Sequence, residues 1–170
     1  VMGGDFDQLL HSIVSTTATE LGVKTASIYL YDKVRDRLTL EAATGYHAYL
    51  EKLPEKPNYA LGEGVTGSIG LKEDILRANS LAELKEKVPT YKGKYLNEGG
   101  QHEPNAFLGI PLIIKPRDGS QPQLIGVMKV EGLGDGVDAK FSPQDESLAQ
   151  MMGNVIATVV HNIQVSRGQL

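Results

Sequence analysis

The sequence predicts an α+β fold, in which an antiparallel sheet is flanked by a helix at each end of the chain. Residues 25–43 and 107–131 each contain two apolar, β-rich runs joined by a polar segment with turn-forming residues. This pattern is typical of an antiparallel hairpin. Apolar residues at helical spacing precede the first hairpin and follow the second. The sheet therefore takes its strands from hairpins, and the long helices come from the two ends.

Length and composition limit the classes of protein that fit. The 170 residues suffice for one domain that buries about two-thirds of its unfolded surface. The absence of cysteine excludes disulfides, a thiolate nucleophile and cysteine-ligated metal. No apolar run is as long as a membrane span, no signal peptide opens the sequence, and a net charge of −4 gives no general attraction to nucleic acid. We expect one cytoplasmic domain at 5–165, with a linker or cloning remnant at 1–4 and the start of a linker to a following domain at 166–170.

The first helix and the first hairpin occupy the N-terminal quarter. Asp5 is expected to cap the helix, with Gln8 three residues later, and the apolar spacing continues until Gly22 ends the run. Residues 25–31 then alternate between apolar and polar, which is the period of a strand. Residues 37–43 repeat that alternation and form the second strand of the hairpin.

The middle of the chain contains a glycine-rich motif and a long polar segment. Residues 50–59 carry charges and two prolines, so we expect a loop there. Gly62–Gly67 (GEGVTG) matches the dinucleotide-binding pattern GxGxxG, but no apolar strand precedes it. The alternative is a tight loop entering a short helix, whose free N–H groups suit an anion. A short strand at 73–79 and a helix at 81–88 follow. The rest of residues 80–105 is long and polar, which is more typical of a segment that covers a site.

A lysine interrupts the last predicted strand. Alternation along Leu124–Glu131 places Lys129 and Glu131 on the same face as Ile125, with Leu124 on the opposite face. If both faces of the sheet are covered, Lys129 is partly buried and needs a partner or a ligand. Alternatively, the strand lies at an edge, and the lysine reaches water.

The closing helix has a strong start signal and a wide apolar stripe. Ser142 is expected at the N-cap, Pro143 at the first helical position and Asp145 at the third. The stripe is formed by Leu148, Met151, Met152, Val155, Ile156, Ala157, Val159, Val160 and Ile163. One sheet cannot cover so wide an arc. Either both terminal helices pack together on the sheet, or part of the stripe contacts another chain.

No motif predicts an enzyme or a metal site. The four histidines, at 11, 47, 102 and 161, lack metal-ligand spacing, and no GxSxG elbow occurs. Lysines and tyrosines alternate within residues 85–95, which is compatible with nucleic-acid binding. Neighbouring glutamates dilute this charge, so a solvated cover over a site is favoured.

The order of these motifs resembles the GAF family of small-molecule sensor domains, over residues from about 6 to 163. The matching motifs are GEGVTGSI at 62–69, GIPL at 109–112, IGVM at 125–128 and FSPQDE at 141–146. The resemblance implies an antiparallel sheet of five or six strands, with both terminal helices on one face. On the other face it implies a ligand cavity closed by short helices.

The resemblance also implies which residues face the cavity. Strand alternation directs Ile28, Leu30, Leu108, Ile110 and Leu112 toward the helices. The implied cavity-lining residues are Ser27, Tyr29, Thr44, Val65, Thr66, Asn79, Phe107, Gly109 and Lys129.

Comparison with sub-families narrows the expected ligand. Bilin-binding members and free-methionine-sulfoxide reductases of this fold use cysteine, which this chain lacks, so neither a covalent bilin nor that reductase chemistry is expected. Cyclic-nucleotide-binding members carry Asn-Lys and then Phe, three residues, Asp-Glu. This chain keeps the second part of the pattern as Phe141, Asp145 and Glu146. Near the place of Asn-Lys it has Glu131 and Gly132 instead. At the position that resembles their strand carboxylate it has Lys129, which has the opposite charge. The reversed charge suits an anionic ligand.

The resemblance therefore implies a non-catalytic regulatory sensor domain of a signal-transduction protein. It would bind a small molecule and relay its state through the terminal helices as a homodimer, without nucleic acid, membrane or metal. Two alternatives are a ligand-free dimerisation or relay module, and an enzyme that uses the same cavity.

Overall fold

A six-stranded antiparallel sheet organises the chain, as the computed structural model shows for residues 3–91, 104–133 and 140–168. The strands are β1 (Thr25–Asp32), β2 (Arg37–Thr44), β3 (Asn58–Ala60), β4 (Leu76–Ala78), β5 (Pro104–Ile114) and β6 (Gln123–Leu133), in the spatial order β3-β2-β1-β6-β5-β4. The helices are α1 (Gly3–Glu20), the 3-10 helix η1 (Gly45–Lys52), α2 (Gly64–Lys72), α3 (Leu81–Lys87) and α4 (Pro143–Ser166). The predicted α+β class, both hairpins and both terminal helices are confirmed.

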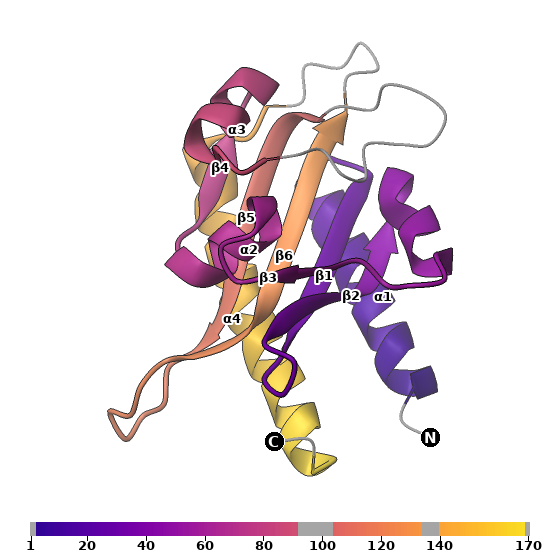
Figure 1. Cartoon of the computed structure of the whole chain (residues 1–170), viewed down its shortest axis with the longest axis vertical. Helices are drawn as coiled ribbons and strands as arrows, with labels where there is room; N and C mark the ends of the chain where they lie inside the picture. The colour runs from indigo at the N-terminus through magenta and orange to yellow at the C-terminus, as the bar shows by residue number, and fades with distance from the viewer. Residues whose placement is uncertain (1–2, 92–103, 134–139, 169–170) are drawn as a thin grey trace.

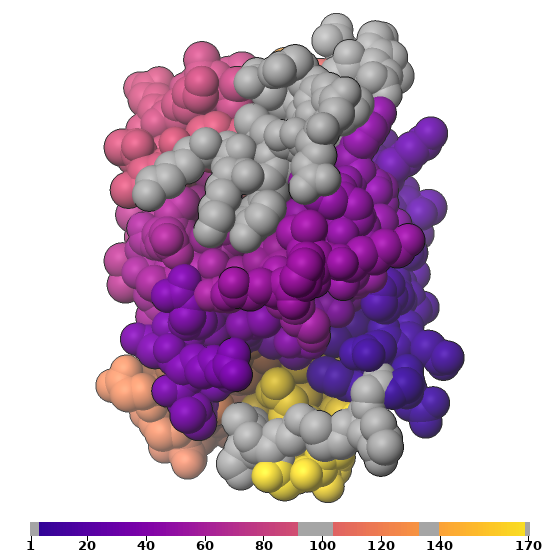
Figure 2. Space-filling view, turned by 45° about the vertical axis from the view of Figure 1, so that its right-hand side comes forward, coloured from indigo at the N-terminus to yellow at the C-terminus, as the bar shows by residue number. Residues whose placement is uncertain are grey.

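The helices form a layer on each face of the sheet. Figure 1 shows α1 and α4 behind the sheet, and η1, α2 and α3 on the other side. Figure 2 shows the purple and magenta atoms of the middle of the chain spread over the front of the molecule. No helix in the described ranges is long and apolar enough to span a membrane.

Two apolar cores follow from the alternation of the strands. The helix-side core packs the sheet against α1 and α4, and it contains Ile28, Leu30, Leu108, Ile110 and Leu112, as predicted. The opposite core packs the other face against η1, α2 and α3, and it contains Tyr29, Leu50, Val65, Leu84, Phe107 and Val127. The central strands are therefore buried on both faces.

A register shift corrects the expected alternation in the second hairpin. Leu112 pairs with Gly126 and Ile113 with Leu124, so Ile125 has no partner on β5. Such a bulge reverses the direction of the side chains before it. Ile125 accordingly belongs to the helix-side core, whereas Leu124 packs against the opposite core. The prediction that Ile125 shares a face with Lys129 was wrong.

Three boundaries also differ from the sequence-based expectation. The loop expected at 50–59 contains the end of η1 and the start of β3, which are too short to give a periodic pattern. Asp5 lies in the first turn of α1 instead of capping it, where its charge still suits the helix dipole. The strand expected at 73–79 is the shorter β4. Of the long segment at 80–105, residues 92–103 lie outside the described residues.

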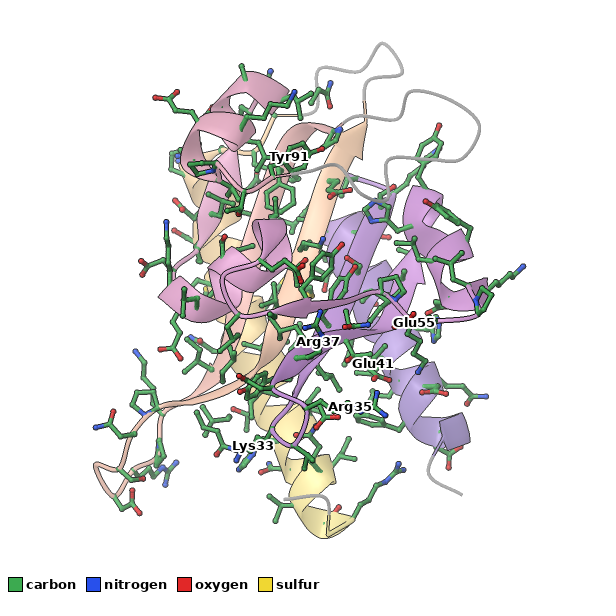
Figure 3. The ribbon with its side chains drawn as sticks, viewed as in Figure 1. Lys33, Arg35, Arg37, Glu41, Glu55 and Tyr91 are labelled. Carbon is green, nitrogen blue, oxygen red and sulfur yellow. The ribbon has the colours of Figure 1, made fainter. Side chains whose placement is uncertain are left out.

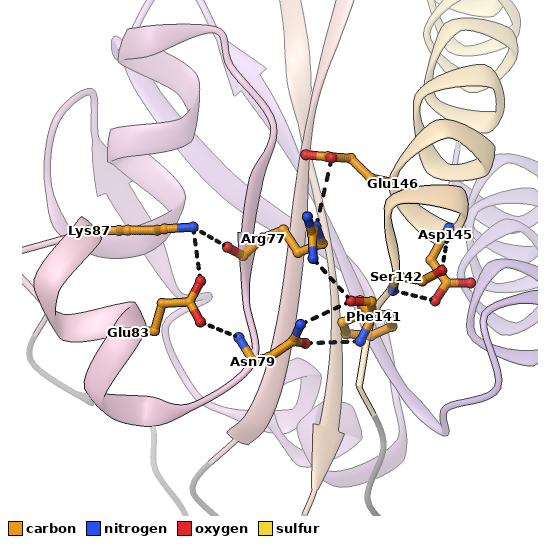
Figure 4. A network of polar contacts seen from close by, with 8 residues as sticks. All are labelled: Arg77, Asn79, Glu83, Lys87, Phe141, Ser142, Asp145 and Glu146. Atoms are coloured by element: carbon orange, nitrogen blue, oxygen red, sulfur yellow. Dashed lines mark hydrogen bonds and ion pairs between the residues drawn. The ribbon is translucent and has the colours of Figure 1, made fainter.

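The start of α4 is fixed by two sets of polar contacts. The predicted cap is present: Ser142 Oγ accepts from Asp145 N at 3.1 Å, and Asp145 Oδ2 accepts from Ser142 N at 2.8 Å. Beside it, Asn79 donates its amide to Phe141 O at 2.9 Å and accepts from Phe141 N at 2.9 Å (Figure 4). Asn79 thus ties the end of β4 to the residue before the cap.

We expect Asn79→Ala to lower the free energy of unfolding by about 2 kcal/mol, because two hydrogen bonds to a buried peptide are lost. For a chain of this size that corresponds to a fall in Tm of about 4–8 °C. Calorimetry measures the change. Asn162→Ala, at an exposed position of α4, is the control and should alter stability by less than about 0.5 kcal/mol. Equal effects of the two substitutions would contradict the role of Asn79.

Candidate functional site

The candidate site lies on the sheet face opposite α1 and α4, in the middle of β6. Lys129 pairs in register with Ser27 on β1 and with Gly109 on β5. Two residues further along β6, Glu131 pairs with Thr25 and Phe107 in the same way. The structure therefore places a lysine and a glutamate side by side in the centre of a sheet.

The Lys129 ammonium lies against two aromatic rings. Its Nζ is 4.9 Å from the ring centroid of Tyr29 and 5.9 Å from that of Tyr59. The two rings meet edge to face, with centroids 5.7 Å apart. Lys129 is 8% exposed, and this burial lowers its pKa from the ordinary 10.5, while the negative charge of Glu131 acts in the opposite direction. Cation–π contact compensates part of the cost of burying the charge.

Glu131 is held by a histidine from η1. His47 Nε2 lies 3.1 Å from Glu131 Oε2, and Glu131 is 7% exposed. Burial lowers the pKa of His47, Glu131 opposes this, and Lys129 adds to the lowering. A neutral imidazole that donates its N–H to the carboxylate fits these directions.

The helix α2 packs on this face of the sheet, and Val65 of its first turn belongs to the same core as Tyr29 and Phe107. Gly109 makes room for the second turn, because a Cβ at that position would lie 2.2 Å from Ile69 Cδ1. The N-cap residue Glu63 makes no side-chain hydrogen bond to the helix. Among the described residues, the hydroxyls of Thr66 and Ser27 are buried without a hydrogen-bond partner. Buried hydroxyls usually have partners, so these two have unused capacity to bind a ligand or water.

The structure brings most of the predicted site residues together. Ser27, Tyr29, Phe107, Gly109 and Lys129 share one face of the sheet, and Val65 and Thr66 lie in the first turn of α2. Thr44 is not brought to that face: it pairs with Ala26, whose side chain belongs to the helix-side core. Asn79 directs its amide to Phe141 instead. A cavity between this face and residues 80–105 stays a prediction, because 92–103 lie outside the described residues.

The sequence analysis did not find two residues that contact Lys129 or Glu131, namely Tyr59 and His47, and it did not assign Glu131 itself to the site. Tyr59 lies within a segment expected to be a loop, and His47 lies 84 residues before its partner, so no local pattern marks either one. Glu131 was noted beside Lys129 but was not assigned to the site. In the described part of the chain, no group of three or more His, Asp or Glu side chains is placed to hold a metal ion.

Comparison with known proteins identifies the family. The model of the GAF domain matches residues 5–160, so the chain belongs to the GAF family. A search of curated proteins finds no match.

Solved structures share the fold at low sequence identity. The GAF domain of a phosphoenolpyruvate-protein phosphotransferase from Coxiella burnetii has a TM-score of 0.72 and 21% identity, covering 99% of this chain and 89% of that one. The corresponding domain from Acinetobacter has a TM-score of 0.69 and 23% identity, covering 96% and 87%. A type II free methionine-R-sulfoxide reductase from Thermoplasma acidophilum has a TM-score of 0.59 and 19% identity, covering 93% and 96%. The fold therefore occurs both as a domain of a phosphotransferase and in a sulfoxide reductase.

We expect Lys129→Met to change how stability depends on pH. Because burial lowers the Lys129 pKa below 10.5, the unfolded wild type binds more protons than the folded protein, and wild-type stability rises as the pH approaches 10.5. The variant lacks this gain. Its free energy of unfolding relative to the wild type should fall with rising pH, by up to about 1.4 kcal/mol per pH unit.

Urea unfolding between about pH 7 and 10 measures the difference. Lys33→Met is the matched control, because Lys33 is exposed in the turn after β1 and is labelled in Figure 3. If the difference in unfolding free energy between Lys129→Met and the wild type does not change with pH, burial does not lower the pKa of Lys129.

Proposed function

We propose that this GAF domain is a non-catalytic regulatory sensor of a cytoplasmic signalling protein, and that it binds a small molecule with an anionic group at Lys129. The observation that carries the proposal is a buried lysine without an ion pair or hydrogen bond among the described residues. Contact with the two tyrosine rings does not give the N–H groups of Lys129 an oxygen or nitrogen acceptor. An anionic oxygen is the partner that best satisfies a buried ammonium.

Nearby groups support an anion at this position. The Ser27 and Thr66 hydroxyls are buried and unpartnered, and both can donate to an oxygen. The first turn of α2 adds backbone N–H groups and the positive end of the helix dipole. Ser27, Tyr29, Val65, Thr66, Phe107, Gly109 and Lys129 are the residues that we assign to the site.

A relay to the terminal helices is supported by contacts of η1. At one end of η1, His47 contacts Glu131. Near the other end, Glu51 Oε1 lies 2.6 Å from His11 Nε2 on α1 and also accepts from Ala43 N at 2.9 Å. One short helix thus contacts both the candidate site and α1.

An apolar groove between α1 and α4 supports dimerisation. The groove has a volume of about 400 Å³ and is lined by Ser12, Ile13, Thr16, Thr17, Leu148, Met151, Met152, Val155 and Ile156. Met151 is 66% exposed and Val155 is 64% exposed. Exposed apolar side chains that form one continuous patch are typical of a protein–protein interface. A second copy, related by a two-fold axis, presents the same apolar surface and therefore covers this one.

The ligand-binding part is tested by native mass spectrometry of protein purified without added ligand. The wild type is expected to carry a small molecule that denaturation releases. Lys129→Ala should retain at least tenfold less, a loss of about 1.4 kcal/mol in binding free energy. Lys33→Ala, at the exposed turn, should retain as much as the wild type. Wild type that carries nothing and shows no NMR shift with a panel of small carboxylates would favour a ligand-free relay module, and turnover of a bound molecule would favour an enzyme.

The dimer is tested by light scattering at micromolar concentration. Wild type should show twice the chain mass of 18.4 kDa. Met151→Glu combined with Val155→Glu should shift it to the single-chain mass, because both side chains are exposed and their charges would be buried at the interface. Val34→Glu is the control, since Val34 is 96% exposed in the turn after β1. A monomeric wild type, or a double variant that stays dimeric, would refute this interface.

A further inference from the structure

The two charged residues of the site do not neutralise each other. Lys129 and Glu131 are two residues apart on one face of β6, so their Cα atoms are about 6.6 Å apart. Both are long side chains, and a direct ion pair is within their reach. Within the described part of the chain, however, no ion pair joins them. Lys129 turns to the rings of Tyr29 and Tyr59, and Glu131 turns to His47.

Each charged group keeps unused hydrogen-bonding capacity. No described group accepts a hydrogen bond from Lys129 Nζ, and His47 engages only Oε2 of Glu131. The residues keep 8% and 7% of their exposure, so neither is completely enclosed. Ser27, the register partner of Lys129, adds a fully buried hydroxyl without a partner. Two oppositely charged residues and a hydroxyl beside Lys129 are thus available on one face.

Electrostatics discriminates among the ligands that fit such a face. A simple anion bound to Lys129 is repelled by Glu131, and a simple cation bound to Glu131 is repelled by Lys129. In a low-dielectric interior these repulsions are stronger than in water. A molecule with both charges a few ångströms apart complements both residues and meets neither penalty.

From this geometry we propose that the ligand is a zwitterion of the α-amino-acid type. Its carboxylate binds Lys129 and its ammonium binds Glu131. The Ser27 hydroxyl donates to the carboxylate, and Tyr29 and Phe107 contact the apolar part of the ligand. The inference rests on the proposed sensor function and specifies the chemical class that the site selects.

The experiment compares matched probes on the wild-type domain by calorimetry. The protein amino acids are screened first, and each one that binds is compared with its deaminated acid and its decarboxylated amine. For leucine these are 4-methylpentanoate and 3-methylbutylamine. We expect at least one amino acid to bind, and both of its one-charge analogues to bind at least tenfold more weakly.

Two near-isosteric variants assign the charges. Lys129→Met should bind the amino acid no better than the amine, and Glu131→Gln should bind it no better than the acid. Lys33→Met and Glu55→Gln, at exposed positions labelled in Figure 3, should keep the wild-type preference. If Glu131→Gln fails to fold, the wild-type comparison of the three probes decides by itself.

The outcomes separate this inference from the proposed function. A carboxylate that binds the wild type as tightly as the matched amino acid overturns the zwitterion and leaves the anion site standing. Binding of no amino acid, while a different retained molecule depends on Lys129, overturns it in the same way. Binding of no probe, with no retained molecule, overturns both proposals.

Discussion

Covering the sheet on both faces is the constraint on which the rest of the structure depends. The strand order places β6 between β1 and β5, away from both edges of the sheet. The helix-side core takes Met128 and Val130, and the opposite core takes Val127. Lys129 and Glu131 occupy the same strand, and each therefore needs a partner inside the protein. The alternative of a lysine that reaches water from an edge strand does not fit a central strand.

The elements with strong local signals were predictable from the sequence. The apolar runs on both sides of KPRDGSQPQ fixed the second hairpin, because alternation and turn residues agree there. Ser142, Pro143 and Asp145 fixed the start of α4 for the same reason. The assignment of faces was also correct where the pairing of β5 and β6 is regular, as at Leu108 and Ile110.

The parts that were not predictable depend on tertiary contacts. The bulge at Ile125 exchanges the faces of two side chains, and the sequence of β6 alone gives no sign of it. Tyr59 lies in a three-residue strand, and His47 in a short 3-10 helix, so neither shows a periodic pattern. Their roles follow from contacts with Lys129 and Glu131, which are distant in the sequence. The polar residue at the centre of the site was therefore predictable, and the groups that hold it were not.

The position of η1 gives the proposed relay a physical route. The 3-10 helix η1 links the candidate site to α1, since it contacts Glu131 through His47 and α1 through Glu51. Under the proposal, a ligand ammonium would bind the carboxylate that His47 already contacts, so it would change the position of His47 and of the helix that carries Glu51. His11, the partner of Glu51, directly precedes Ser12 and Ile13, which line the α1–α4 groove. In the proposed relay, a carboxylate shared between the ligand and His47 would give η1 different positions in the free and bound states. Such a difference is the requirement for coupling the site to the proposed dimer interface.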